Sequence, residues 1–125
     1  MHGPRYMAAV CLGLALCGAP ALAHHSFSAE FDASNRITLK GTVRQVDWAN
    51  PHVSVRLAVQ GRDGTSVNWD VEFGPPSMLL SRGVRKGDFR IGAQVTIDGF
   101  RGKNNTQAMV ARVLTLADGT ELFVR

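Results

Sequence analysis

The sequence predicts an all-β domain, a small OB-fold-like barrel of five to six strands with one short helix between strands 3 and 4. Segments in which apolar and polar residues alternate recur through residues 37–125, and this period of two is typical of half-buried strands. Turn-forming glycines and prolines separate the segments. Three strands, a helix and two or three further strands is the order of an OB-fold. A generic β-sandwich, the alternative, would normally need more strands.

Three strands are expected before the helix, over residues 37–48, 52–60 and 67–73. The apolar positions of the first strand change parity, which favours a β-bulge near Arg44 and Gln45. Asn50-Pro51 is a turn signal, and residues 61–64 suit a hairpin connection. The residues of the third strand expected to face inward are Val67, Trp69, Val71 and Phe73.

Residues 75–82 are predicted to form the helix, because prolines are tolerated at a helix start and Gly83 can end it. The later strands are expected over residues 95–100 and 108–116, with a short sixth over residues 120–124. Residues 26–36 lack a clear periodicity, and they make up most of the segment 24–36 before the first strand. We expect them to form an extended N-terminal arm that packs Phe27 and Phe31 on the barrel domain of residues 37–125.

Residues 1–23 have the three-part layout of a secretory signal peptide. Arg5 precedes an apolar run over residues 7–16, and an Ala-Leu-Ala sequence ending at Ala23 supplies the cleavage site. The run is short for a bilayer span, which disfavours the alternative of a retained membrane anchor. A signal peptide that is cleaved after Ala23 indicates a periplasmic or secreted protein, and we expect no membrane span in the mature chain.

Both cysteines, Cys11 and Cys17, lie within the predicted signal peptide. The mature chain is therefore expected to have no disulfide and no cysteine-based metal site. A lipoprotein anchor on Cys17 is the alternative, but Leu16 stands before it where a small residue is normally wanted.

The charge of the chain is mildly positive. Its 125 residues include 14 basic and 10 acidic side chains, for a net charge of +4. Cleavage after Ala23 would remove Arg5 and no other charged residue. This charge does not favour a dedicated polyanion binder, and an exported protein rarely meets nucleic acid, so no nucleic-acid partner is expected. The sequence has no phosphate-binding glycine loop, no serine-nucleophile motif and no helical His-Glu-x-x-His. We expect a protein that is not an enzyme.

Cleavage after Ala23 would make His24 the amino terminus, where the free amine and the imidazole Nδ1 can chelate one metal ion. A free α-amino group has a pKa near ~8, so a metal can displace its proton at neutral pH. Nitrogen ligands of this kind suit copper as Cu(II), which favours tetragonal sites. His25 or His52 could supply a third nitrogen, an arrangement similar to the histidine brace of exported copper proteins. The alternative is an ordinary polar chain terminus with incidental metal affinity.

The second candidate site lies at the corner between the first two strands, where His52 could face the same end of the barrel as the arm. In OB-folds the loops after strands 1 and 4 flank the ligand face. The ligand or partner face predicted on these loops consists of Trp48, Asn50, Arg101, Lys103 and Asn104. The structural alternative is that Trp48 packs on the core, Asn50 makes the turn and His52 hydrogen-bonds locally.

Two further groups of charged residues are weaker candidates. Asp70 and Glu72 project from one side of a strand, and Glu30 and Asp32 lie in the arm. Paired carboxylates can act as an acid and a base or as oxygen ligands, but on an alternating strand they are more often a solvated face. The cations after the helix could bind an anion or simply complement the helix dipole, and they are Arg82, Arg85, Lys86 and Arg90.

Several blocks of the mature chain together resemble a bacterial family of small exported proteins of unknown function. The blocks are His24-His25-Ser26-Phe27, Glu30-Phe31-Asp32, Leu39-x-Gly41-x-Val43, Trp48-x-Asn50-Pro51-His52, Trp69-x-x-Glu72 and Leu116-Ala117-Asp118-Gly119. The chain departs from the family pattern at Val84, where tryptophan is usual, and at Ile91-Gly92, where Pro-Gly is typical. The resemblance implies the compartment and the architecture, and it transfers no catalytic residue.

The first functional hypothesis is a periplasmic binding module that holds a copper-type ion through His24, with His25 and His52 as candidate partners. The alternative is an accessory protein that binds no metal and docks an exported partner through its barrel face. A copper-dependent oxidase is disfavoured, because a mature chain of 102 residues leaves little room for a substrate platform.

Overall fold

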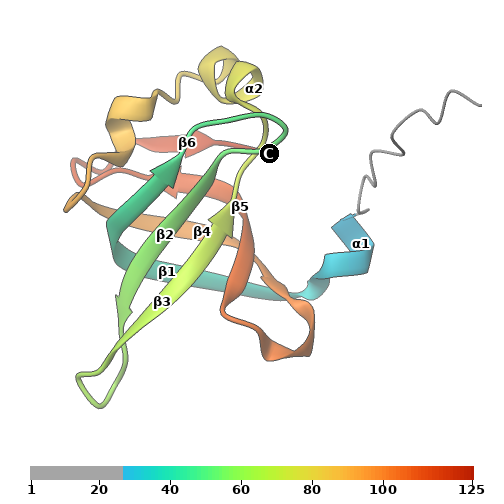
Figure 1. Cartoon of the computed structure of the whole chain (residues 1–125), viewed down its shortest axis with the longest axis vertical. Coiled ribbons are helices and arrows are strands. Elements are labelled where there is room, and N and C mark those ends of the chain that lie inside the picture. Colours follow the sequence, from blue (N-terminus) through green and yellow to red (C-terminus); the bar gives the residue numbers. More distant parts are fainter. Residues whose placement is uncertain (1–26) are drawn as a thin grey trace, which may run out of the picture.

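The computed structural model describes residues 27–125 (Figure 1). The predicted signal peptide, His24 and His25 lie outside the described residues. The elements in chain order are α1 (Phe27–Glu30), β1 (Phe31–Asp47), β2 (Ser54–Gln60), β3 (Ser66–Glu72), α2 (Pro76–Ser81), η1 (Lys86–Phe89), β4 (Gln94–Gly102), η2 (Lys103–Asn105), β5 (Ala108–Thr115) and β6 (Glu121–Phe123). Within this part of the chain, no helix has the length and apolar character needed to cross a bilayer.

The six strands form one sheet in the order β3-β2-β1-β4-β5-β6. The long strand β1 pairs antiparallel with both β2 and β4, and it therefore belongs to both halves of the sheet. A short parallel pairing of β3 with β5 links the two sides, so the pairings of β1, β2, β3, β5 and β4 form a ring. With α2 between β3 and β4, this arrangement confirms the predicted all-β, OB-fold-like architecture.

The alternating residues of the strands form the core, as the sequence predicts. The fully buried side chains include those at the inward positions of β2 and of neighbouring strands, namely Val43, Val55, Leu57, Val71, Ile97 and Leu114. Val67 is 38% exposed, although its parity predicts an inward position. Val67 pairs with Val59 next to the turn of the β2–β3 hairpin, and this hairpin projects beyond the rest of the sheet in Figure 1.

The predicted β-bulge in the first strand is confirmed. The pairing of β1 with β2 shifts register between Val43 and Gln45. A second shift occurs between Asp98 and Gly99 in the pairing of β4 with β5. At Gly99 an added Cβ would lie 2.0 Å from the carbonyl oxygen of Val110, so only glycine permits this approach of the two strands.

The first strand begins earlier than predicted, at Phe31, so residues 31–36 belong to β1 and not to a separate arm. Residues 27–30 form one helical turn and are not extended. A register shift between Phe31 and Arg36 interrupts the pairing with β4, which explains why this segment lacks a regular alternation. The predicted packing is confirmed, because the Phe27 ring lies 5.6 Å from that of Phe100 and 5.9 Å from that of Phe31.

The segment between β3 and β4 closes one end of the core. The predicted helix is present as α2, but the sequence did not predict η1, whose Asp88 accepts a hydrogen bond from the Arg85 backbone N–H at 2.7 Å. Leu79, Val84 and Phe89 are buried under this segment. Val84, where the family pattern has tryptophan, is therefore a core residue.

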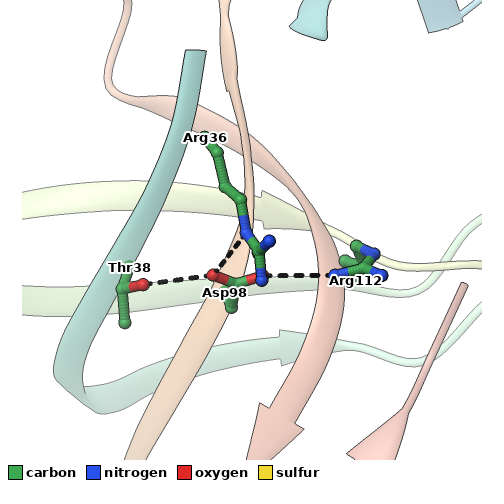
Figure 2. Close-up of polar contacts among 4 residues, drawn as sticks. All are labelled: Arg36, Thr38, Asp98 and Arg112. Carbon is green, nitrogen blue, oxygen red and sulfur yellow. Dashed lines mark hydrogen bonds and ion pairs between the residues drawn. The ribbon is translucent and has the colours of Figure 1, made fainter. Parts of the chain in front are cut away.

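Asp98 ties three neighbouring strands together on the outer face of the sheet, as Figure 2 shows. Nε of Arg36 on β1 donates to both carboxylate oxygens at 3.0 Å, and the hydroxyl of Thr38 donates at 3.2 Å. Arg112 of β5 lies 4.0 Å away. Hydrogen bonding to Asp98 raises the pKa of the Arg36 guanidinium above its ordinary value.

Candidate functional site

The predicted corner residue His52 lines a hollow of about 440 Å³ that we call the His52 pocket. Four parts of the chain meet there: the end of α1 with the start of β1, the β1–β2 loop, the end of β3 and the start of β5. The lining residues are Glu30, Phe31, Pro51, His52, Ser54, Asp70, Val71, Glu72, Ala108 and Met109. The pocket thus brings the beginning of the described chain beside the Trp-x-Asn-Pro-His block.

His52 lies in a chain of charged groups that crosses the wall of the pocket. Its Nδ1 is 3.6 Å from Oε1 of Glu72, which is an ion-pair distance and too long for a hydrogen bond. The same oxygen lies 3.9 Å from a guanidinium nitrogen of Arg125. The His52 side chain is 45% exposed and that of Glu72 is 29% exposed, so the imidazole remains open to a ligand from the pocket.

Asp70 and Glu72, the paired carboxylates of the sequence, have different cationic partners. Nε of Arg56 on β2 donates to Asp70 at 2.8 Å, and this hydrogen bond raises the pKa of the Arg56 guanidinium. Glu72 instead faces His52 and Arg125. Arg56 and Arg125 are site residues that sequence reasoning missed. Neither lines the pocket, but each contacts a carboxylate of its wall, and no local motif marks them because only the folded sheet brings these partners together.

Besides the packing of the Phe27 ring on that of Phe100, two contacts hold α1 against the sheet beside the pocket. The guanidinium of Arg125 lies over the ring of Phe27, 5.9 Å from its centroid. The amine of Lys103 donates a short hydrogen bond to the carbonyl oxygen of Ser28. The first described turn of the chain is therefore held next to His52 and Glu72. His24 and His25, the other predicted metal ligands, lie outside the described residues.

Trp48 and Asn50, on the β1–β2 loop, lie near the pocket without lining it. The half-buried Trp48 ring packs on that of Phe89 at 6.4 Å, tilted by 49°, and adjoins the hydrophobic core. Asn50 is exposed, and its peptide bond to Pro51 is cis. Their assignment to a ligand or partner face stays a prediction.

Of the residues predicted on the other loop, Arg101 instead lies near the end of β4, whereas Lys103 and Asn104 belong to η2. The Arg101 guanidinium donates to the carbonyl oxygens of Thr106 and Asn105 at 3.1 and 2.8 Å, and it lies 5.1 Å from the centre of the Trp69 ring. Asn104 adopts the left-handed conformation, with φ of 58°. These contacts and the backbone conformation define the positions of the three residues. Their role in binding a ligand or partner stays a prediction.

Four ionisable side chains line the His52 pocket. It combines one imidazole with three carboxylates, those of Glu30, Asp70 and Glu72. Within residues 27–125, no group of three or more histidine, cysteine, aspartate or glutamate side chains is arranged to hold a metal ion. A metal site that used His52 would therefore need ligands from outside this range.

The fold and the pocket define a small OB-type β domain with a polar hollow beside its N-terminal helical turn. The chain belongs to a family of unknown function, DUF6152, whose family model matches residues 11–111. The expected membership in a family of unknown function is thus confirmed.

No curated protein matches the sequence. Among solved structures, the chain is similar to Rim1, a mitochondrial single-stranded DNA binding protein from S. cerevisiae. The two share 21% sequence identity with a TM-score of 0.48, over 66% of this chain and 93% of that chain.

Proposed function

We propose that this chain is a periplasmic, non-enzymatic binding protein that holds a copper-type ion through the amine and imidazole of His24. His25 and His52 supply the further nitrogen ligands. The observation that carries the proposal is the position of His52, in a pocket whose wall includes the end of α1 and the start of β1. This position supports a site that His52 shares with residues preceding Phe27.

The distances between neighbouring groups from Phe27 to His52 support a shared site. Phe27 is the third residue after His24, and an extended chain covers at most about 10 Å over three residues. From the ring of Phe27 the Arg125 guanidinium is 5.9 Å away, and from Arg125 to Glu72 the distance is 3.9 Å. Glu72 is 3.6 Å from the imidazole of His52. This chain of contacts from Phe27 to His52 supports a site that His52 shares with residues preceding Phe27.

In the proposed site, the 3.6 Å separation between Glu72 and the imidazole of His52 closes to a hydrogen bond, through which Glu72 orients the ring. A histidine that binds a metal through one ring nitrogen commonly directs the other toward a carboxylate, which fixes the tautomer and the ring plane. Glu72 faces Nδ1 of His52, so Nε2 is the nitrogen left for the ion. The carboxylates that line the pocket also favour a cation over an anion.

The test is a Cu(II) titration of the protein purified after export, in competition with a chelator of known affinity. Mass spectrometry first establishes that the chain begins at His24. The proposal predicts one tight site per chain. It also predicts that one alanine added before His24 abolishes tight binding, because the amine and the imidazole then no longer form the chelate.

Two substitutions in the same loop separate the role of His52 from a general effect on the loop. His52→Ala removes a nitrogen ligand and should weaken Cu(II) binding. Asn50→Ala is the matched control, because Asn50 is also exposed in this loop and does not line the pocket. Equal affinity of the His52→Ala variant and the wild type would remove His52 from the site.

Weak or non-stoichiometric binding by the correctly processed wild type would contradict the metal proposal. It would favour the accessory protein that docks an exported partner. The exposed side chains of Asn50 and Asn104, on the predicted partner face, are the observation that favours this second function.

A further inference from the structure

The segment between β3 and β4, together with β6, carries most of the exposed apolar side chains of the described chain. Of the four large apolar side chains that are exposed within residues 27–125, three lie here: Leu80 is 53% exposed, Ile91 66% and Phe123 59%. The fourth, Val67, belongs to the β2–β3 hairpin, whose tip lies at the opposite end of the sheet from α2 in Figure 1. The exposed apolar area is therefore concentrated at one end of the domain.

Direct contacts hold α2 beside β6. The guanidinium of Arg82, directly after α2, donates a hydrogen bond to the carbonyl oxygen of Phe123 at 3.3 Å. An added Cβ at Gly83 would lie 3.9 Å from a methyl carbon of Leu122. Leu80 of α2 and Phe123 of β6 thus belong to neighbouring elements at the same end of the sheet.

The segment cannot turn these apolar side chains into the core. Successive residues of a helix point about 100° apart, so a rotation that buried Leu80 would expose Leu79, which is fully buried. The turn that carries Ile91 is also fixed, because the N–H of Gly92 donates to the carbonyl oxygen of Val43 on β1 at 2.8 Å. Leu80 and Ile91 therefore remain available to a partner.

The same segment is basic. Residues 74–93 contain four cations and one acid, for a net charge of +3, and the adjoining β5–β6 hairpin adds the acids Asp118 and Glu121. The carboxylates of Asp88 and Asp118 accept hydrogen bonds from the backbone N–H groups of Arg85 and Thr120, at 2.7 and 2.8 Å. Within residues 27–125, none of the four cations forms an ion pair. All four are exposed, and they are Arg82, Arg85, Lys86 and Arg90.

Exposed apolar side chains among unpaired cations match the surface of an anionic membrane. Apolar side chains enter the boundary between headgroups and acyl chains, and cations attract the anionic headgroups. The three apolar side chains come from three elements, namely α2, the turn after η1 and β6. A lipid surface deforms to accommodate such separate anchors, whereas a protein partner would need a matching rigid shape.

We propose that the end of the domain formed by α2, η1 and β6 binds the surface of a phospholipid membrane that contains anionic lipids. Leu80, Ile91 and Phe123 enter the headgroup boundary, and the cations of residues 82–90 lie at the headgroups. The chain lies on the membrane and does not cross it. This binding does not depend on the His52 pocket or on a metal ion.

Co-sedimentation with vesicles tests the proposal. The protein is purified after export, so that the apolar run of residues 7–16 is absent and does not itself bind lipid. We expect it to bind vesicles of phosphatidylcholine mixed with phosphatidylglycerol more tightly than vesicles of phosphatidylcholine alone. Binding should weaken between 0.1 and 1 M salt, because the Debye length falls from about 10 Å to about 3 Å.

Two pairs of variants locate the contact. Lys86→Gln should weaken binding to the anionic vesicles about fivefold, and Arg62→Gln is its control, because Arg62 is an exposed cation on the β2–β3 hairpin. Ile91→Ser should weaken binding about tenfold, and Val67→Ser is its control at the same hairpin. Both controls should bind as the wild type does. Circular dichroism should show the same fold in all four variants, since each changes an exposed side chain.

Three results would overturn the proposal. The first is no binding to the anionic vesicles, which would favour an acidic protein as the partner of these cations. The second is equal binding to anionic and neutral vesicles. The third is a loss in the control variants as large as that in Lys86→Gln and Ile91→Ser.

Discussion

Replacing Gly99 with alanine should separate β4 from β5 at the point where they approach most closely. The added Cβ would lie 2.0 Å from the Val110 carbonyl oxygen and 2.8 Å from the Met109 methyl carbon, whereas real Cβ atoms are essentially never closer than 3.0 Å to such atoms. The backbone contact can be relieved only if the strands move apart by about 1 Å.

The expected loss of stability follows from that movement. Forcing an extra carbon into a well-packed place costs about 1–3 kcal/mol. The ladder hydrogen bonds on both sides of Gly99 also lengthen, and each contributes about 1 kcal/mol. We expect the free energy of unfolding to fall by about 2–4 kcal/mol, a large part of the 5–15 kcal/mol typical of such a domain.

Urea unfolding followed by circular dichroism measures this loss. Gly87→Ala is the matched control, because an added Cβ at Gly87 meets nothing within 4 Å, and it should change the free energy of unfolding by no more than about 0.5 kcal/mol. A loss below about 1 kcal/mol for Gly99→Ala, or an equal loss for both variants, would refute the reasoning from the strand contact.

Three further predictions concern other parts of the fold. Leu79→Ala should lower the free energy of unfolding by about 2–5 kcal/mol in the same urea assay, because Leu79 is fully buried; a loss near zero would contradict its place in the core. Asp98→Ala should lower the free energy of unfolding by no more than about 1 kcal/mol in the same assay, because the arginine partners of Asp98 are exposed. A loss above about 3 kcal/mol would contradict a weak contribution from these ion pairs. Hydrogen bonds from Thr65 lower the pKa of the Asp63 carboxyl below its ordinary 3.8, so its stabilising contribution is present above pH 3.8 and is lost as the pH falls through the lower pKa. In Thr65→Val an NMR titration should show this carboxyl closer to 3.8, and an unchanged midpoint would exclude the hydroxyl as the main cause.

Much of the fold follows from local patterns in the sequence. Alternation locates β1 to β5 because each strand buries one face, and the change of parity in β1 locates the bulge after Val43. The start of β1 at Phe31 could not be found in this way. The interrupted pairing after Phe31 leaves polar residues outside the core, so the segment carries no alternation.

The exposure of Val67 shows a second limit of pattern reasoning. Parity tells which side of a strand a residue faces, but it does not tell whether another strand covers that side. The β2–β3 hairpin extends past the other strands of the sheet. Whether a hairpin projects in this way depends on the lengths of all the strands, which one strand's alternation does not reveal.

The sequence identified some residues of the candidate site, but it did not show how they pair. The Trp-x-Asn-Pro-His block marked His52, and the alternating strand marked Glu72 as one of two carboxylates. Their pairing with each other and with Arg125 could not be predicted, because it depends on the meeting of the β1–β2 loop, β3 and the last residue of the chain. Local motifs identified chemistry-bearing residues, and tertiary structure decided which of them act together.

The most direct test of the central claim is pulsed electron paramagnetic resonance on the exported protein loaded with one equivalent of Cu(II), after mass spectrometry has shown that it begins at His24. The account predicts a tetragonal, nitrogen-rich spectrum, and it predicts that His52→Asn removes the signal of one imidazole. A spectrum that is identical in the wild type and in the His52→Asn variant, or one typical of loosely bound aqueous copper, would contradict a site shared by the N-terminus and the His52 pocket.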